Sequence, residues 1–271
     1  MRPEPHRECA DVWHDYRADR AIFTDADARI HVWRVCLDDA AEPMPSVLSD
    51  DERERAARFS RPLDRRRFVA ARATLRAILA DMLDLDATGS ATLRFGYRAA
   101  GKPYLIDHPK LHFNISHSED YALVAATRAG EIGIDIERQR PMHDMDSIAR
   151  VAFTEAERAA LIGCPSGDRS AVFYRIWTRK EALLKASGDG LPALSDPEAA
   201  SLGGAATRWL VTGLPHLDGY VASLARPRTA HGMKLWSWPG AAALRSVERR
   251  ARPRLAPATL PSPLPRWELC R

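Results

Sequence analysis

The 271-residue chain has few cysteines and no long apolar run. None of its four cysteines forms a CxxC pair, so their spacing shows neither a zinc-binding pattern nor a disulfide framework. No apolar stretch approaches the length of a membrane span. The first residues lead into no apolar signal region, so we expect a chain that is not secreted and whose thiols stay reduced. These absences favour a globular protein of the cytoplasm.

Hydrophobic residues make up 45% of the chain, a value typical of globular proteins. The net charge of +4 is distributed unevenly, because residues 226–271 hold ten Lys or Arg against two Glu. The rest of the chain is therefore net acidic. The basic excess belongs to the C-terminal segment and is not a sign of a nucleic-acid-binding body. We expect neither a nucleic acid nor a membrane as partner.

Hydrophobic periodicity predicts a mixed α+β chain. Strands are expected at residues 30–37, 93–97, 112–116, 121–126, 133–137, 209–212 and 220–225, and helices at 49–59, 63–83, 146–151, 155–162 and 171–186. The helix from residue 49 begins with a capping-box pattern, Ser-Asp-Asp-Glu. Each half of the chain runs strand, helices, strands, which indicates a pseudo-dimer of two similar α+β subdomains packed side by side.

We divide the chain accordingly into four parts. They are an N-terminal extension at 1–28, an N-terminal α+β subdomain at 29–132, a C-terminal α+β subdomain at 133–226, and a basic, Pro- and Arg-rich extension at 227–271. The composition of residues 252–266 predicts that the last part is partly disordered.

Acidic residues in two distant segments are the first candidates for chemistry. Asp135 and Glu137 lie two residues apart in a strand, so both project from the same face. Glu181 follows Lys180 in a predicted helix and precedes Lys185 by four residues. Carboxylates on one face repel each other unless a cation lies near them. A third carboxylate with lysines beside it would complete a site for a divalent ion and a phosphate ester. The alternative is a solvated strand face and a surface ion pair.

A second candidate is the hexapeptide Phe-Asn-Ile-Ser-His-Ser at residues 113–118. Its alternation makes one strand face polar, and Ser116 and His117 near the strand end suit phosphate oxygens. The side chains of these two neighbours diverge, and no GxSxG elbow accompanies them, so a Ser–His hydrolase is not favoured. The alternative is a hairpin turn without further function.

Two basic segments complete the set of candidates. Lys102 lies in a Gly-Lys-Pro turn, where a lysine is usually just exposed. Residues 64–67 hold three successive arginines and are followed by Arg72 and Arg76 on the same helix. Most of these arginines should be solvated, although one or two could reach a phosphate.

In this order the segments resemble a known family. The relevant stretches are Gly-Lys-Pro at 101–103, Phe-Asn-Ile-Ser-His-Ser at 113–118, Gly-Ile-Asp-Ile-Glu at 133–137 and Trp-Thr-Arg-Lys-Glu-Ala-Leu-Leu-Lys at 177–185. Together they closely resemble the 4′-phosphopantetheinyl transferases of the surfactin-synthetase-activating type. Each stretch alone is weak, whereas four in order are specific. The resemblance covers roughly residues 28–226 and leaves both extensions outside.

The resemblance implies a reaction and a fold. Such enzymes transfer the phosphopantetheine arm of coenzyme A to a serine of a carrier protein and release adenosine 3′,5′-bisphosphate. Their fold is a pseudo-dimer of two α+β halves with coenzyme A in the cleft between them. By this likeness Asp135, Glu137 and Glu181 would hold Mg²⁺, with Mn²⁺ as the alternative, on the pyrophosphate. This chemistry needs charge neutralisation and positioning more than a covalent nucleophile.

The resemblance also assigns roles to single residues. Glu181 would activate the serine hydroxyl, directly or through water, and Lys185 would neutralise the leaving bisphosphate. Glu52 occupies a position where relatives can present a lysine for the 3′-phosphate, and it cannot do that work. The residues expected to bind coenzyme A are Arg55, Arg67, Lys102, Ser116, His117 and Lys180, with His117 on the 3′-phosphate.

We therefore expect a cytoplasmic, mostly monomeric phosphopantetheinyl transferase that serves an acyl, peptidyl or aryl carrier. The carrier should dock on an apolar patch near the cleft, and residues 152–158 and the helix with Trp177 are the candidates. Two alternatives stay open. One is a metal-dependent nucleotide phosphohydrolase that uses the same carboxylates with water. The other is a module that binds coenzyme A without turnover.

Overall fold

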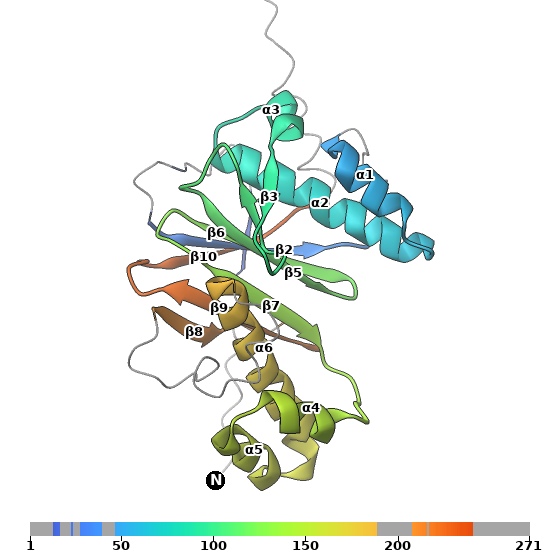
Figure 1. Ribbon diagram of the computed structural model, residues 1–271, viewed down its shortest axis with the longest axis vertical. Helices are drawn as coiled ribbons and strands as arrows, with labels where there is room; N and C mark the ends of the chain where they lie inside the picture. Colours follow the sequence, from blue (N-terminus) through green and yellow to red (C-terminus); the bar gives the residue numbers. More distant parts are fainter. Residues whose placement is uncertain are drawn as a thin grey trace, which may run out of the picture.

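Two β-sheets packed between helices form the centre of the protein, as the computed structural model in Figure 1 shows. The structure describes residues 13–16, 23, 28–39, 47–188, 208–215 and 217–240. In Figure 1 helix α2 lies above the sheets, α4 and α5 lie below them, and α6 runs from the level of the second sheet down to α4 and α5.

The elements follow the chain in two groups. The first group is β1 (His14–Asp15), β2 (Ile30–Cys36), α1 (Asp50–Ala57), α2 (Pro62–Met82), α3 (Ala87–Thr92), β3 (Phe95–Tyr97), β4 (Pro103–Leu105), β5 (His112–Ser118) and β6 (Tyr121–Thr127). The second is β7 (Gly133–Arg138), α4 (Met145–Ala152), α5 (Glu155–Gly163), the short 3-10 helix η2 (Ser166–Asp168), α6 (Arg169–Ser187), β8 (Trp209–Gly213), β9 (Tyr220–Pro227) and β10 (Met233–Ser237).

The strands form one large sheet and two smaller ones. The first sheet has five strands in the order β1-β10-β2-β6-β5, in which β2, β6 and β5 are antiparallel neighbours. The second sheet has three antiparallel strands in the order β7-β9-β8. Strands β3 and β4 pair as a small hairpin. The paired strands β5 and β6 confirm the hairpin that the alternating sequence predicts.

The apolar faces of the elements build successive layers. Helix α2 covers one face of the first sheet, where Leu75 and Ile78 pack with Trp33 and Val124. The other face of that sheet packs on the second sheet through residues including Ile30, Val32, Leu123, Ile134 and Ile136. Helix α6 covers the outer face of the second sheet. The order helix, sheet, sheet, helix confirms a mixed α+β fold built from two α+β subdomains.

Local signals in the sequence explain where the main helices begin and end. The Ser49 backbone N–H donates to the Glu52 carboxylate at 3.0 Å, which confirms the predicted capping box of α1. Helix α2 begins with Pro62, whose missing N–H is not needed in a first turn. Helix α6 ends at Gly188, which adopts a left-handed conformation with φ 81°.

The structure differs from the sequence-based division at both extensions. Residues His14–Asp15 and Met233–Ser237 form β1 and β10, and both strands belong to the first sheet. Strand β10 is short and lies in a segment with many basic residues, so its buried Leu235 gives only a weak pattern. Its parallel pairing with β2 joins residues about two hundred positions apart, which no local signal encodes. Residues 252–266, predicted to be disordered, lie outside the described residues.

None of the helices in the described parts of the chain combines the length and the apolar composition that a membrane span needs.

Candidate active site

The seam between the two sheets is lined by polar side chains of β5 and β7. These strands lie side by side but in different sheets, and side chains rather than a backbone ladder join them. Asn114 Oδ1 accepts a hydrogen bond from the Ile134 N–H at 2.9 Å. Ser116 donates to Asp135 at 2.9 Å, and Ser118 donates to Glu137 at 3.1 Å. Because side chains alternate along both strands, the polar face of residues 113–118 in β5 meets the acidic face of residues 133–137 in β7.

Asp135 is the most buried of the acidic candidates, with 3% of its surface exposed. Its Oδ1 atom accepts from the Lys185 ammonium at 2.6 Å and from the Ser116 hydroxyl. Lys185 also contacts Ser116 Oγ at 3.0 Å. Burial raises the pKa of the Asp135 carboxyl in spite of these partners. The ion pair thus joins α6 to the seam without fully compensating the buried charge.

Gly133 lets α6 approach β7 closely enough for that contact. A Cβ atom at residue 133 would lie 2.0 Å from the Ala182 carbonyl oxygen and 2.4 Å from the Ala186 nitrogen. The buried hydroxyls of Thr178 and Ser223, 2.9 Å apart, hold the same helix on β9. Helix backbone therefore packs directly on strand backbone, and the side chains of Glu181 and Lys185 reach the seam.

Burial raises the pKa values of Glu137 and Glu181 as it raises that of Asp135. The pKa of Glu137 is raised by burial and by the charge of Asp135, and hydrogen bonds from Ser118 and Trp177 oppose that rise. The pKa of Glu181 is raised by burial, lowered by Lys185, and raised again by Asp135 and Glu137. The three carboxyl groups therefore act on one another and form one acidic cluster.

Basic groups gather beside the acidic cluster. His117 is exposed at the end of β5, yet its partial burial and the positive charges of Lys185 and Arg55 lower its pKa. The Arg55 guanidinium lies 5.5 Å from the centre of the Phe68 ring, which places it on the rim formed by α1 and α2. The charges of Arg55 in α1 and Lys185 in α6 thus both act on His117 in β5.

The other residues of the first helix pair are structural. Glu52 is buried and accepts from the Nε atoms of Arg72 and Arg76, each at 2.6 Å. Arg76 also donates to the carbonyls of Ser90 and Leu93, both at 3.0 Å. These arginines join α1, α2 and the chain after α3, so they are neither solvated nor directed at a phosphate.

Lys102 lies at the junction of two cavities. One, of about 630 Å³, includes Tyr97, Arg98 and Tyr104 in its wall, and the other, of about 430 Å³, includes Glu181 and Lys185. Both are also lined by Lys102, Pro103 and Gly188, so they adjoin.

The Lys102 ammonium is directed at protein groups. It donates to Glu131 Oε2 at 2.5 Å and to the carbonyls of Ile132 at 3.0 Å and Ala186 at 3.2 Å. A lysine has three N–H donors, so these bonds use its whole capacity. Hydrogen bonds from His112 and Lys102 lower the pKa of Glu131 to about 2. Lys102 therefore fastens the turn to the end of α6 and shapes the wall of both cavities.

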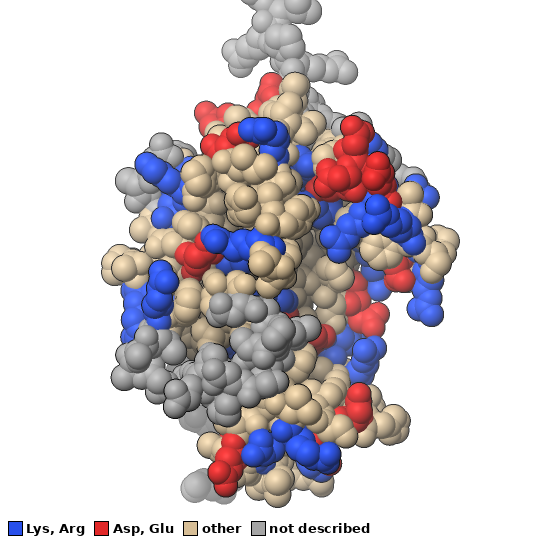
Figure 2. Space-filling model, viewed as in Figure 1, with Lys and Arg blue, Asp and Glu red and all other residues tan. Residues whose placement is uncertain are grey.

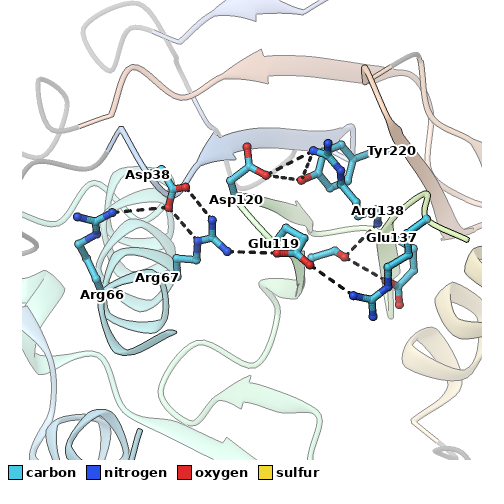
Figure 3. A network of polar contacts seen from close by, with 10 residues as sticks. Asp38, Arg66, Arg67, Glu119, Asp120, Glu137, Arg138 and Tyr220 are labelled. Atoms are coloured by element: carbon cyan, nitrogen blue, oxygen red, sulfur yellow. Dashed lines mark hydrogen bonds and ion pairs between the residues drawn. The ribbon is translucent and has the colours of Figure 1, made fainter. Parts of the chain in front are cut away.

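Two further candidates lie away from the acidic cluster. Arg67 forms a two-pronged ion pair with Asp38 at 2.8 and 2.7 Å and contacts Glu119 at 3.5 Å (Figure 3). Lys180 is fully buried and donates to Glu157 of α5 at 3.0 Å. The structure thus brings Asp135, Glu137, Glu181, Lys185, Ser116, His117 and Arg55 together and directs Arg67 and Lys180 to protein partners.

Comparison with known proteins follows the same segments. A family model described as the 4′-phosphopantetheinyl transferase superfamily matches residues 131–211, and one described as 4′-phosphopantetheinyl transferase, N-terminal, matches residues 32–129. The 4′-phosphopantetheinyl transferase HetI of Nostoc sp. is 40% identical over 177 residues, which cover 63% of this chain and 73% of HetI.

The chain belongs to the 4′-phosphopantetheinyl transferase superfamily.

Two other 4′-phosphopantetheinyl transferases show the same relation. Sfp of Bacillus subtilis (strain 168) is 31% identical over 162 residues, covering 60% of this chain and 70% of Sfp. AcpT of Escherichia coli O157:H7 is 33% identical over 149 residues, covering 55% of this chain and 68% of AcpT. The enzyme class is therefore phosphopantetheinyl transferase. Neither the nucleotide phosphohydrolase nor the non-catalytic binding module finds support in these comparisons.

The acidic cluster of this phosphopantetheinyl transferase fits a divalent cation that phosphate oxygens help to bind. Among the described residues, no three acidic, histidine or cysteine groups are placed to surround an ion on their own. However, Asp135 Oδ2 and Glu181 Oε1 are buried and have no hydrogen-bond partner within the described structure. These two oxygens can therefore accept a further positive partner beside Lys185. Mg²⁺ usually takes one or two carboxylates together with substrate phosphates, so two such oxygens suit it.

Sequence reasoning missed three residues that build the site. Gly133 begins a predicted strand and a family-like stretch, but the sequence does not predict the close backbone approach that a glycine in a strand can mark. Ser118 was treated with the phosphate-binding hexapeptide, although its two-residue spacing from Ser116 places both on the side that faces β7. Glu131 carries no local signal, because its partners Lys102 and His112 are distant in sequence.

Proposed function

We propose that the transferase binds coenzyme A and Mg²⁺ in the cleft between β5, β7 and α6. There it transfers 4′-phosphopantetheine to a serine of an acyl, peptidyl or aryl carrier and releases adenosine 3′,5′-bisphosphate. One observation carries the assignment of the cleft. Asp135 and Glu181 each hold a buried, unpartnered carboxylate oxygen beside Lys185, within the part of the chain that the structure describes. This arrangement suits a cation and a diphosphate that arrive together.

In this proposal Asp135, Glu137 and Glu181 hold the ion. Bound there, Mg²⁺ would neutralise the pyrophosphate and act as a Lewis acid. Mn²⁺ accepts the same oxygen ligands and could replace it. The raised pKa values of the three carboxyl groups support this proposal, because a nearby cation would lower them again.

The chain's own groups account for the transfer step. The serine oxygen forms a bond to the β-phosphorus of coenzyme A, while the bond from that phosphorus to the bridging oxygen breaks. Glu181 takes the serine proton, directly or through a water molecule, and its raised pKa improves it as a base. Lys185 donates a hydrogen bond to the leaving bisphosphate, whose charge grows during the step.

The basic residues and cavities suggest how coenzyme A lies. The positive charges of Arg55 and Lys185 act on His117, so we assign the 3′-phosphate to His117 and Arg55. Ser116 lies between Asp135 and Lys185 and would contact the pyrophosphate region. The cavity of about 430 Å³, with Glu181 and Lys185 in its wall, adjoins the larger one and offers room for the nucleotide.

Three basic residues that the resemblance assigns to coenzyme A have other roles in this proposal. They are Lys102, Arg67 and Lys180. Lys102 supports the cavity wall rather than offering a free ammonium, because Glu131 and two carbonyls accept its hydrogen bonds. Arg67 and Lys180 bind coenzyme A only if they leave Asp38 and Glu157. We therefore rank Arg55 and His117 above them as ligands of coenzyme A.

The carrier docks, in this proposal, on helices α4 and α5. Phe153, which the sequence suggested as a docking residue, is 3% exposed and belongs to the core with Phe173 and Leu161, so its substitution would test folding instead. Large apolar side chains are exposed nearby, with Val151 68% and Ile162 75% accessible. Exposed apolar side chains on these helices, which lie between the two acidic segments in the sequence, support this choice of docking face.

We further propose that the enzyme acts as a cytoplasmic monomer without a nucleic-acid or membrane partner. On the face shown in Figure 2, basic and acidic side chains are interspersed rather than gathered into a patch of one sign. A nucleic-acid-binding surface requires a continuous basic stripe or patch.

Mass spectrometry of apo-carriers incubated with the protein, coenzyme A and Mg²⁺ tests the proposed function. The expected result is a mass gain of one phosphopantetheine arm on the carrier serine, with one bisphosphate released per carrier. Bisphosphate release that is independent of the carrier would instead indicate hydrolysis. Tight binding of coenzyme A without any carrier modification would indicate a module that has lost turnover.

A further inference from the structure

Glu137 is held from the opposite subdomain by a single hydroxyl group. Ser118 Oγ, at the end of β5, accepts a hydrogen bond from the Arg138 N–H at 3.0 Å and donates one to Glu137 Oε2 at 3.1 Å. A serine hydroxyl has one proton to donate. Because the Arg138 N–H supplies its own proton, that of Ser118 is left for Glu137. The direction of the bond to the carboxylate is therefore fixed.

The turn that follows Ser118 is anchored on both subdomains, as Figure 3 shows. Glu119 contacts Arg67 of α2 at 3.5 Å and Arg140, after β7, at 3.6 Å. Arg67 is itself fixed by its two-pronged pair with Asp38. The turn thus lies between a helix of the first subdomain and the end of the strand that carries Asp135 and Glu137.

Asp120 continues this anchoring. Its carboxylate accepts a hydrogen bond from the Tyr220 hydroxyl of β9 and lies 3.8 Å from Arg138, and its carbonyl accepts from the Leu37 N–H at 2.7 Å. Glu119 has a positive φ of 51°, which a residue other than glycine keeps only where its surroundings require it. The turn is therefore a rigid base for the Ser118 hydroxyl.

Glu137 has a second support on the other side, since Trp177 of α6 also hydrogen-bonds to it. Its carboxylate is thus set by one group from each subdomain. Partners of this kind orient metal ligands, and their loss typically costs about 10- to 100-fold in metal affinity.

We propose that Ser118 is a positioning residue that orients the Glu137 carboxylate toward the cation shared with Asp135 and Glu181. Through the β5–β6 turn, the first subdomain then helps to assemble an acidic cluster whose members all belong to the second. This inference rests on the proposed function.

The test compares Ser118→Ala and Ser118→Thr in the full chain. Mn²⁺ is titrated in the presence of coenzyme A, and free Mn²⁺ is measured by electron paramagnetic resonance. We expect Ser118→Ala to weaken Mn²⁺ binding about 10-fold or more and Ser118→Thr, which keeps the hydroxyl, to restore it. In transfer assays the KM for Mg²⁺ rises in Ser118→Ala, whereas the KM for coenzyme A at saturating Mg²⁺ does not change.

Ser237→Ala is the matched control. Ser237 Oγ accepts a hydrogen bond from Arg34 at 2.8 Å in β10, so this variant also removes a hydroxyl that contacts a charged group. It should bind Mn²⁺ as the parent does. If Ser118→Ala does not fold, Ser118→Cys replaces it, because a thiol of similar size donates only weakly.

Two results separate the inference from the function on which it rests. Unchanged Mn²⁺ affinity and unchanged KM for Mg²⁺ in Ser118→Ala would overturn the role of Ser118 and leave the transferase assignment intact. A parent protein that modifies no carrier would instead contradict the proposed function.

Discussion

Single residues in the acidic cluster are poorly stabilised as ions. Burial raises the pKa values of Asp135, Glu137 and Glu181, so ionising each one costs more in the folded chain than in the unfolded chain. Asp135 has the ion pair with Lys185, but the unpartnered oxygens of Asp135 and Glu181 show that compensation is incomplete among the described groups. Binding sites commonly lower the free energy of unfolding in this way, because the groups that activity requires are not the ones that stabilise the fold best.

Glu181→Gln should therefore separate stability from activity. Burial, together with repulsion by Asp135 and Glu137, makes this charge costly, so removing it at pH 7 should raise Tm by about 2 to 4 °C, equivalent to roughly 1 kcal/mol in a chain of this size. Carrier modification should fall by about 10²-fold or more, because the base is lost. Calorimetry and a transfer assay measure both. Glu54→Gln, at an exposed position of α1, should change neither. A lower Tm in Glu181→Gln would contradict the account.

The same cluster predicts a pH dependence of stability. A carboxyl group whose folded pKa is raised binds more protons in the folded than in the unfolded state, so its effect is most favourable at low pH and is lost as pH rises through the folded pKa. The Tm advantage of Glu181→Gln over the parent should thus be absent below the ordinary glutamate pKa and grow towards neutral pH. Thermal scans from pH 4 upwards measure this difference. An advantage that shrinks with rising pH would refute it.

The sequence predicts single-residue geometry only where local periodicity controls it. Alternation correctly placed Asp135 and Glu137 on one side of β7, away from the buried Ile134 and Ile136. Burial raises the pKa values of both carboxyl groups, and for Glu137 the charge of Asp135 adds to the rise, as expected of such neighbours. The partners of Lys102 and Lys180 could not be predicted, because Glu131 and Glu157 come close only through the tertiary fold.

At the level of secondary structure elements, the contact between α6 and β7 determines the site. The helix carries Glu181 and Lys185, the strand carries Asp135 and Glu137, and Gly133 permits their backbones to meet. Any increase in their separation would take Lys185 away from Asp135, whose ion pair measures 2.6 Å.

Gly133→Val is expected to push the two elements apart. The atoms that a Cβ would meet belong to the helix backbone at Ala182 and Ala186, so no side-chain rotation can relieve the clash. Overpacking of this kind costs about 1 to 3 kcal/mol, and we expect a comparable loss in the free energy of unfolding together with loss of transfer. Denaturant titration and the carrier assay measure these effects.

Gly213→Val is the control for that substitution. Gly213 lies in β8 of the same sheet, and a Cβ atom there would have no described heavy atom within 4 Å. It should keep both stability and activity near the parent values. Equal losses in the two glycine variants would show that the close approach at Gly133 is not the cause.

Most elements were predictable because they are long and regularly patterned. The predicted helices at 63–83 and 171–186 correspond to α2 and α6 within two residues at each end. Short elements were missed, among them β4 and α3. Strand β4 has only three residues and starts with a proline, and α3 consists of Ala, Thr, Gly and Ser with little apolar periodicity.

For the whole molecule, the two ends of the described chain complete the first sheet. Strand β10 lies between β1 and β2, and Leu235 and Trp238 from this segment are 7% exposed. The repeated order of elements predicts two similar subdomains. It does not predict that β10 pairs with β2, because about two hundred residues separate these strands in the sequence.

Two truncations should therefore behave differently. Ending the chain after Pro227 removes β10 and its buried side chains, and we expect a loss of about 3 kcal/mol or more, which lowers Tm by roughly 6 °C or more. Ending it after Gly240 keeps every described contact of the first sheet. Circular dichroism melts and transfer assays of both proteins measure the outcome. Equal stability of the two truncations would show that β10 contributes nothing to the fold.

The place of β10 also has a consequence during synthesis. A ribosome produces β1 and β2 first, yet these strands cannot complete their sheet until Met233–Ser237 has been translated and released. The nascent chain must keep one edge of β2 open during most of elongation, and an open edge invites pairing with other chains. The N-terminal half therefore reaches its final sheet only after β10, the last of the described strands, has left the ribosome.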